Sequence, residues 1–146
     1  MTIAICGSLD FTKEIKKLAD ELKSKGFTVK IPLTSEKILK GQLTVQDIKK
    51  EKKEGQFAKR AIKYDSIRKY WNIIVKSDVI LVANYDKNDI KNYIGGNSFL
   101  EMGFAHVLEK PIYLLNGIPK IMYRDEIEAM QPISLKGTLE NLHLNP

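Results

Sequence analysis

Residues 78–83, Asp-Val-Ile-Leu-Val-Ala, contain the apolar run that decides the expected fold. After Asp78, every position from Val79 to Ala83 is apolar. A strand with one face in water alternates apolar and polar residues, whereas a strand that is apolar throughout is buried on both faces. Strands of this second kind are typical of parallel sheets that helices cover on each side. This stretch therefore predicts an α/β protein.

The rest of the chain alternates between predicted strands and predicted helices. The further strands are Thr2–Cys6, Phe27–Ile31, Pro111–Leu115 and a short one at Ile133–Leu135. Such alternation predicts a doubly wound, flavodoxin- or Rossmann-like parallel sheet of about five strands with helices on both faces. Helices are expected over Asp10–Gly26, from Thr44, over about Gln56–Lys76, through Glu101 and over Tyr123–Met130.

Polar residues mark where two of these helices should begin. Asp10 precedes an apolar stripe at helical spacing and is a suitable N-cap. Thr44 and Asp47 have the spacing of a capping box. With 146 residues, the chain is expected to form a single domain over residues 1–146, long enough to bury a core.

Composition narrows the function classes. No apolar run approaches membrane-spanning length and the amino terminus leads directly into a strand, so no membrane partner and a cytoplasmic location are expected. The single cysteine, Cys6, cannot support a disulfide framework and is interpreted as a small buried hydrophobe. No cluster of histidine, cysteine and carboxylate has metal-ligand spacing, so neither a metal nor a cofactor is expected.

The formal net charge of +6 is concentrated in one region. Lysines dominate the segment Lys37–Lys69, which includes the run Lys49-Lys50-Glu51-Lys52-Lys53. Such a run usually marks a solvated helical face, and the alternative is a site for nucleic acid or a phosphorylated small molecule. No aromatic residue interrupts the run Lys49–Lys53, as stacking on bases would require. A nucleic-acid partner is therefore the less favoured interpretation.

Residues 93–105, Tyr-Ile-Gly-Gly-Asn-Ser-Phe-Leu-Glu-Met-Gly-Phe-Ala, carry the strongest chemical signal. They place Glu101 in the expected first turn of a helix that follows a glycine-rich loop. The positive end of the helix dipole should keep a carboxylate there ionised. An ionised carboxylate among apolar neighbours at the edge of a sheet suits nucleophilic attack on a sugar carbon. The alternative is a first-turn glutamate that only complements the dipole.

Ligands of doubly wound sheets bind beyond the carboxyl ends of the strands. The loops that should meet there are Gly7–Asp10, Asn84–Asn97 and Asn116-Gly117. Gly7 would let the backbone approach a ligand, and Ser8 with nearby helix amides would hold a phosphate or a sugar hydroxyl.

The second of these loops supplies most of the remaining candidate substrate-binding residues. Asn97 is either the N-cap of the Glu101 helix or an amide that holds a sugar hydroxyl, or both. Ser98 is either a first-turn residue or a phosphate ligand. The predicted substrate-binding set is Gly7, Ser8, Asn84, Tyr85, Gly96, Asn97 and Ser98.

Several short motifs resemble the nucleoside 2-deoxyribosyltransferase-like superfamily, which includes the 2′-deoxynucleoside 5′-monophosphate N-glycosidases. They are Ile5-Cys6-Gly7-Ser8 after the first strand, Ser77-Asp78 before an apolar strand, Glu101-Met102-Gly103-Phe104-Ala105, and Lys110-Pro111-Ile112. The resemblance implies that Glu101 attacks the anomeric carbon of a nucleoside or nucleotide and forms a covalent glycosyl-enzyme. It also implies that Gly7 and Ser8 lie near the sugar or phosphate, and that the protein is a homodimer or larger homo-oligomer.

The chain departs from the family pattern where the leaving base should be activated. Tyr70 stands where the family usually has an aspartate, and Asp65 is the only acid in the main body of that expected helix. Asp65, Tyr70 or a loop residue would have to take this role. The leading hypothesis is an N-glycosidase or glycosyltransferase acting on a nucleoside or nucleoside 5′-monophosphate. The alternatives are a non-catalytic nucleotide-binding or sensing module and, less favoured, a nucleic-acid-associated protein.

Overall fold

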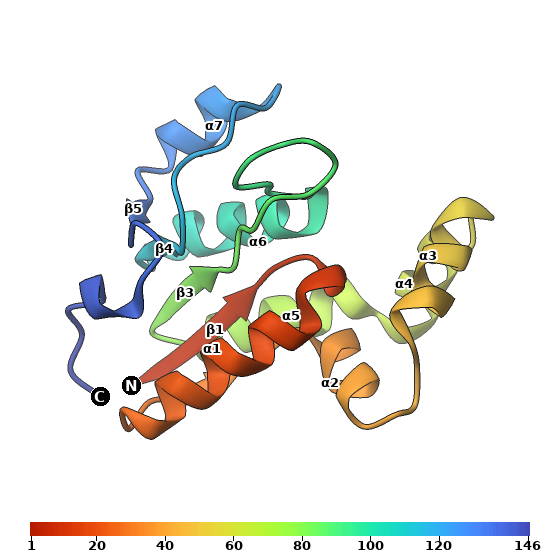
Figure 1. Cartoon of the computed structure of the whole chain (residues 1–146), viewed down its shortest axis with the longest axis horizontal. Coiled ribbons are helices and arrows are strands. Elements are labelled where there is room, and N and C mark those ends of the chain that lie inside the picture. The colour runs from red at the N-terminus through yellow and green to blue at the C-terminus, as the bar shows by residue number, and fades with distance from the viewer.

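The computed structural model describes residues 1–146 and contains one parallel sheet of five strands (Figure 1). The strand order is β2-β1-β3-β4-β5, and every pairing is parallel. This is the flavodoxin-like order, so the predicted doubly wound α/β fold is confirmed. The strands are β1 (Thr2–Cys6), β2 (Thr28–Lys30), β3 (Val79–Val82), β4 (Ile112–Leu114) and β5 (Ile133–Ser134).

Seven α-helices and two short 3₁₀ helices connect and cover the strands. Figure 1 shows α3 and α4 on one side of the molecule and α7 with β5 on the other. No helix is both long enough and apolar enough to cross a membrane. The elements are η1 (Leu9–Phe11), α1 (Thr12–Ser24), α2 (Leu33–Leu39), α3 (Val45–Lys53), α4 (Phe57–Tyr64), α5 (Ser66–Val75), α6 (Gly96–Val107), α7 (Arg124–Ala129) and η2 (Leu139–Asn141).

The sheet separates two hydrophobic cores. Alternate residues of β1 point to opposite faces: Ile3 and Ile5 belong to the core that α1 covers, and Ala4 and Cys6 belong to the core that α5 and α6 cover. β3 is buried along its whole length, as its continuous apolar sequence predicts. β1 and β3 lie at the centre of the sheet, where helices on both faces exclude water.

The direction in which the chain adds strands to the sheet reverses between β1 and β3. From β1 the chain continues to β2 on one side, and from β3 it continues to β4 on the other side. This is the switch point at which doubly wound folds bind ligands. Asp78 lies at the opposite edge, where its carboxylate accepts a hydrogen bond of 2.6 Å from the backbone N–H of Thr2. Asp78 therefore lies away from the ligand edge.

The expected long helix over about Gln56–Lys76 is wrong, because the chain breaks it at Asp65. Asp65 has φ 47° and ψ 45°, the left-handed conformation that ends α4 and lets α5 start in a new direction. Aspartate tolerates this conformation better than most residues with a side chain. The apolar stripe continues at helical spacing across the break, which is why periodicity alone predicts one helix.

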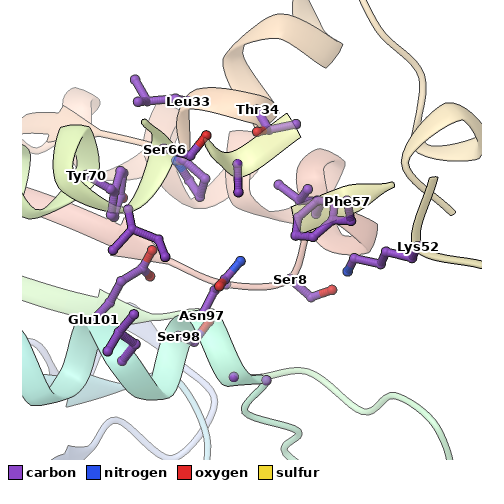
Figure 2. A pocket seen from close by; sticks show the side chains of 18 of the residues that line it. Ser8, Leu33, Thr34, Lys52, Phe57, Ser66, Tyr70, Asn97, Ser98 and Glu101 are labelled. Atoms are coloured by element: carbon purple, nitrogen blue, oxygen red, sulfur yellow. The ribbon is translucent and has the colours of Figure 1, made fainter. Parts of the chain in front are cut away.

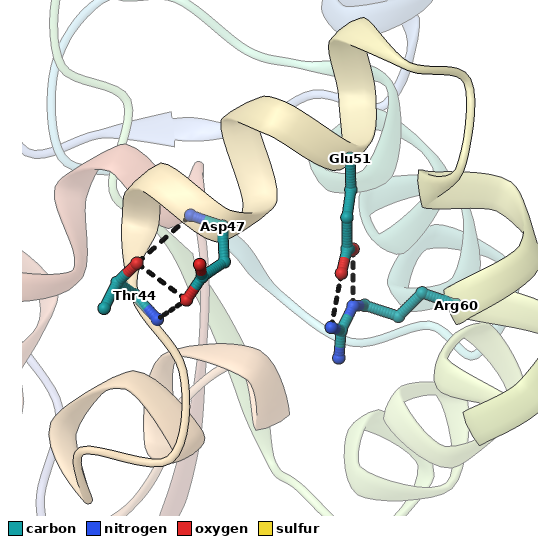
Figure 3. Close-up of polar contacts among 4 residues, drawn as sticks. All are labelled: Thr44, Asp47, Glu51 and Arg60. Atoms are coloured by element: carbon teal, nitrogen blue, oxygen red, sulfur yellow. Dashed lines mark hydrogen bonds and ion pairs between the residues drawn. The ribbon is translucent and has the colours of Figure 1, made fainter.

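Helix starts are predicted correctly only in part. Thr44 and Asp47 form the predicted capping box of α3: the Thr44 hydroxyl accepts from the Asp47 N–H at 3.1 Å, and Asp47 accepts from the Thr44 N–H at 2.8 Å (Figure 3). Asp10, however, is not an N-cap. Ser8 caps η1 instead, and α1 follows from Thr12. Helix α2, which follows Pro32, has no counterpart among the predicted elements.

We expect opposite signs for two substitutions at Asp65. Asp65→Gly should stabilise the protein by about 0.5–1 kcal/mol, because glycine adopts left-handed angles without a steric cost. Asp65→Ala should destabilise it by about 1 kcal/mol. The exposed Asp65–Arg68 ion pair, at 3.7 Å, is lost in both variants and contributes little. Urea unfolding measures both values, and the reverse order of stability would indicate a continuous helix.

Candidate active site

One pocket opens at the carboxyl edge of the sheet, where the loop after β1 meets the start of α6. Helices α3, α4 and α5 form its other walls. Its enclosed volume of about 170 Å³ is smaller than the roughly 300–1,000 Å³ of pockets that hold a whole drug-sized ligand. The enclosed part therefore suits one sugar-sized group, with the rest of a ligand in the open mouth.

Glu101 projects from α6 into the inner part of this pocket, towards α5 (Figure 2). It lies in the second turn of α6, which starts at Gly96 with Gly95 as its N-cap. The expectation that Glu101 occupies the first turn, and that Asn97 is the N-cap, is therefore wrong. Gly95 takes the extended N-cap conformation with φ −82° and ψ 171°, and no side chain caps this helix.

Burial raises the pKa of Glu101 from 4.5 to about 8. The thiol of Cys6 opposes this change by donating a hydrogen bond that stabilises the carboxylate. Desolvation prevails because the effect of the helix dipole falls off within the first turn. The expectation that the dipole keeps Glu101 ionised is thus wrong for the empty pocket. At neutral pH the carboxyl group holds its proton.

Tyr70 and Cys6 lie next to Glu101 and carry no charge at neutral pH. Burial is the main cause of the raised pKa of Cys6 and of Tyr70. Interaction with the neighbouring Glu101 raises the pKa of each residue further. The Tyr70 hydroxyl donates a hydrogen bond to the carbonyl of Ile5 in β1. Tyr70 therefore lines the pocket as predicted, while its hydroxyl proton is used in a hydrogen bond to the backbone.

Asp65 lies outside the pocket. Its side chain is about half exposed and faces Arg68, which leaves it away from Glu101. Of the three predicted catalytic residues, the structure brings together Glu101 and Tyr70 and leaves Asp65 apart. Glu101 is the only acidic residue that lines the pocket.

Five of the seven predicted substrate-binding residues line the pocket: Gly7, Ser8, Gly96, Asn97 and Ser98. Figure 2 shows Asn97 pointing from the first turn of α6 into the space between Glu101 and Ser8. The N–H groups of this first turn have no intrahelical acceptor, as at every helix start, and no side chain accepts from them.

Gly7 is tightly packed. A Cβ atom there would lie 3.1 Å from the side chain of Ile15 and 3.3 Å from Ala83. The sequence interpretation, in which Gly7 lets a ligand approach the backbone, is therefore not needed to explain this glycine.

Asn84 and Tyr85 do not line the pocket. Asn84 is fully buried and joins two loops: its amide donates to the carbonyl of Gly117 at 2.9 Å, and its Oδ1 accepts from the N–H of Asn116 at 2.9 Å. Tyr85 packs edge-on against Phe11, with 5.2 Å between ring centroids. Both residues hold neighbouring segments together at the ligand edge and do not line the pocket. The prediction that they contact substrate is therefore wrong for this pocket.

Three cationic side chains also line the pocket, and sequence reasoning did not single them out. They are Lys52 on α3, Arg60 on α4 and Lys87 in the loop after β3. Lys87 spans the ligand edge, because its ammonium donates to the Ser8 hydroxyl at 2.8 Å and pairs with Asp10 at 2.9 Å. The lysine-rich composition was the available signal, yet it does not distinguish Lys52 from the other lysines of α3, and Lys52 is itself exposed.

No group of three or more histidine, cysteine or acidic side chains lies close enough to hold a metal ion. Comparison of the chain with protein-family models, with curated proteins and with solved structures finds no match in any of the three.

Replacing Glu101 by Gln should change how stability depends on pH. Between pH 4.5 and about 8 the folded protein holds a proton that the unfolded chain has released, so the free energy of unfolding falls as pH rises. Glutamine does not ionise and removes this loss. We expect the stability of Glu101→Gln relative to the wild type to rise by about 4 kcal/mol between about pH 5 and pH 9, at about 1.4 kcal/mol per unit of pH across the shift.

Urea unfolding at several pH values measures this difference. Glu140→Gln is the matched control, because Glu140 is exposed and forms no ion pair. A constant difference between Glu101→Gln and the wild type over this pH range would contradict the raised pKa.

Proposed function

We propose that the protein cleaves the N-glycosidic bond of a nucleoside or nucleoside 5′-monophosphate through a covalent glycosyl-Glu101 intermediate. The observation that carries this proposal is the position of Glu101. It is the only acid lining a pocket whose enclosed part is sugar-sized and whose mouth carries hydroxyls, helix amides and cations. The resemblance of residues 101–105 to the nucleoside 2-deoxyribosyltransferase-like superfamily supports the same assignment.

In this mechanism, the Glu101 carboxylate attacks the anomeric carbon while the bond from that carbon to the base nitrogen breaks. The electron pair of that bond leaves with the base, which takes up a proton. Water then attacks the glycosyl ester and regenerates Glu101, or a second base does so in a transfer reaction. Positive charge that develops on the sugar favours the ionised form of Glu101, which offsets part of the cost of its burial.

The leaving base takes up a proton from a group near the pocket or from solvent. Asp65 lies too far from the pocket to supply it, and the Tyr70 hydroxyl donates to Ile5 in the empty protein. Tyr70 serves as the acid only if substrate draws its hydroxyl away from that carbonyl. Solvent in the open mouth of the pocket is the other proton source.

Glu101→Gln should abolish base release. We expect kcat to fall about a thousandfold or more, because the amide oxygen is a poor nucleophile. A screen of nucleosides and nucleoside 5′-monophosphates for free base measures this, with Glu140→Gln as the control that keeps full activity. Base release by Glu101→Gln at the wild-type rate would exclude the covalent mechanism.

The pH dependence distinguishes a nucleophile from a general acid. A nucleophilic Glu101 must be ionised, so kcat/KM should rise with pH and level off above about 8. A decrease of kcat/KM above this pH would assign Glu101 the role of proton donor instead.

A nucleotide-binding or sensing module is the second candidate function. It is favoured by the absence of a second acid from the pocket lining and by the protonated state of Glu101 at neutral pH. Calorimetric binding of nucleotides without base release over long incubation would support it. Rapid base release would exclude it.

We also propose a homodimer in the cytoplasm. The free, buried thiol of Cys6 suits a reducing compartment. Helix α6 carries two exposed apolar side chains, Leu100 at 41 % and Val107 at 80 % exposure, beside an apolar hollow between α6 and α7.

If this face forms the dimer, Val107→Lys should yield monomers of 16.7 kDa in light scattering. Met122→Lys should leave the dimer intact, because Met122 is an exposed apolar residue outside α6. A monomeric wild type, or a dimeric Val107→Lys variant, would contradict the proposed interface.

A further inference from the structure

The loop between β3 and α6 contains a small hairpin. Lys87 and Ile90 exchange two backbone hydrogen bonds of 3.0 Å, and the residues between them, Asn88 and Asp89, have φ values of 53° and 58°. Positive φ at both central residues is what a type I′ hairpin turn requires. Hydrogen bonds within the loop therefore fix the backbone from which the Lys87 side chain starts.

The side chain of Lys87 joins this hairpin to the loop after β1. Its ammonium lies 2.9 Å from the carboxylate of Asp10 and donates to the Ser8 hydroxyl at 2.8 Å. Four of the six ion pairs span three or four residues and a fifth joins α3 to α4, whereas this pair joins loops far apart in the sequence.

Asp10 neutralises the charge that Lys87 brings to the pocket. The side chains of Lys87 and Asp10 are 19 % and 25 % exposed, so water screens this pair only partly. Burial alone would raise the pKa of Asp10, but the hydrogen bond and the charge of Lys87 lower it. Asp10 is therefore ionised at neutral pH, and Lys87 acts here by its geometry more than by its charge.

Ser8 receives two hydrogen bonds whose direction is fixed by chemistry. An ammonium and a backbone N–H can only donate, so the Ser8 oxygen accepts from Lys87 at 2.8 Å and from the N–H of Asp10 at 3.4 Å. A serine hydroxyl has two acceptor sites and one proton. Both acceptor sites are used, and no acceptor in the protein takes the proton.

This proton is available to a ligand, because Ser8 lines the pocket (Figure 2). Removing the ammonium of Lys87 would allow two competing arrangements. One acceptor site of Ser8 would become free, so that its hydroxyl would accept as readily as donate. The carboxylate of Asp10, which contacts the same ammonium, would also become free to take the Ser8 proton. Lys87 thus keeps the hydroxyl of Ser8 as a donor towards the pocket.

We propose that Lys87 is a positioning residue that acts through Ser8: it holds the Ser8 hydroxyl as a hydrogen-bond donor, so that the pocket selects ligands with an acceptor atom at this point. This inference rests on the proposed function, because Glu101 defines the reacting end of the ligand. Lys87 lies outside the motifs that carry the family resemblance. It takes no part in breaking the glycosidic bond.

A double-mutant cycle of Ser8→Ala and Lys87→Met tests this role. All variants are made in Glu101→Gln, so that ligands are not consumed, and calorimetry measures the binding of nucleosides and nucleoside 5′-monophosphates. We expect each single change to weaken binding about 5- to 20-fold, for the same class or classes of ligand. The double variant should bind within about twofold of Ser8→Ala, because Lys87 has no effect once the hydroxyl is gone.

Two further variants separate positioning from a general effect on the loop. Lys91→Met is the matched control, because Lys91 is an exposed lysine of the same loop that forms no ion pair, and it should bind like its parent. Lys87→Arg should restore most of the affinity, because a guanidinium also donates to both partners. The contact between Phe11 and Tyr85, with 5.2 Å between ring centroids, should keep the two loops together in Lys87→Met.

Four results would overturn the inference. Unchanged binding by Lys87→Met would exclude any role, and losses that multiply in the double variant would show that Lys87 acts without Ser8. A loss confined to monophosphates in Lys87→Met, when Ser8→Ala also weakens nucleosides, would assign the effect to the unpaired charge of Asp10. Absence of binding of every ligand by the parent would also overturn it.

Activity of the otherwise wild-type protein separates this inference from the proposed function. If no base is released but the losses in the cycle coincide, the role of Lys87 in binding stands and the proposed chemistry fails. If base is released but the losses multiply, the chemistry stands and the role of Lys87 fails.

Discussion

The central constraint of this structure is the complete burial of β3. An apolar strand of this kind needs a hydrogen-bonded neighbour on each side and helices above and below, and β1, β4, α1 and α6 meet these needs. Covering both faces requires the chain to wind in both directions from the centre of the sheet. The reversal falls between β1 and β3, and it opens an edge at which loops from both halves converge around a pocket.

The same burial determines the chemistry of Glu101. Its carboxyl group lies against the end of β1 and beside α5, where loss of water outweighs the thiol hydrogen bond of Cys6 and raises the pKa to about 8. The empty pocket therefore holds a neutral acid. Under the proposed function, positive charge that develops at the sugar carbon of a substrate would favour the carboxylate. A phosphate nearby acts in the opposite direction and would hold the proton on Glu101. The cations at the pocket mouth offset that effect.

Sequence patterns predict the elements better than they predict the site. Apolar runs locate the three inner strands, short stretches in which apolar and polar residues alternate locate the two edge strands, and the spacing of Thr44 and Asp47 locates the start of α3, because these signals are local. The start of α6 is misplaced because Gly95 takes the N-cap conformation without any side-chain cap, and Asp65 breaks a helix without breaking its apolar stripe. Lys52 differs from Lys53 only in the direction in which it leaves α3, which depends on packing of α3 against α4.

The segment from α2 to α4 gives the pocket its distinct character. The sheet, the loop after β1 and α6 supply an acid and free helix amides, a combination that by itself does not distinguish a sugar from a sugar phosphate. Helices α3 and α4 add Lys52 and Arg60 to the lining, and Glu51 on α3 neutralises Arg60 on α4. The acid of the pocket lining therefore lies on α6 beside the central strands, whereas Lys52 and Arg60 lie on a separate wall.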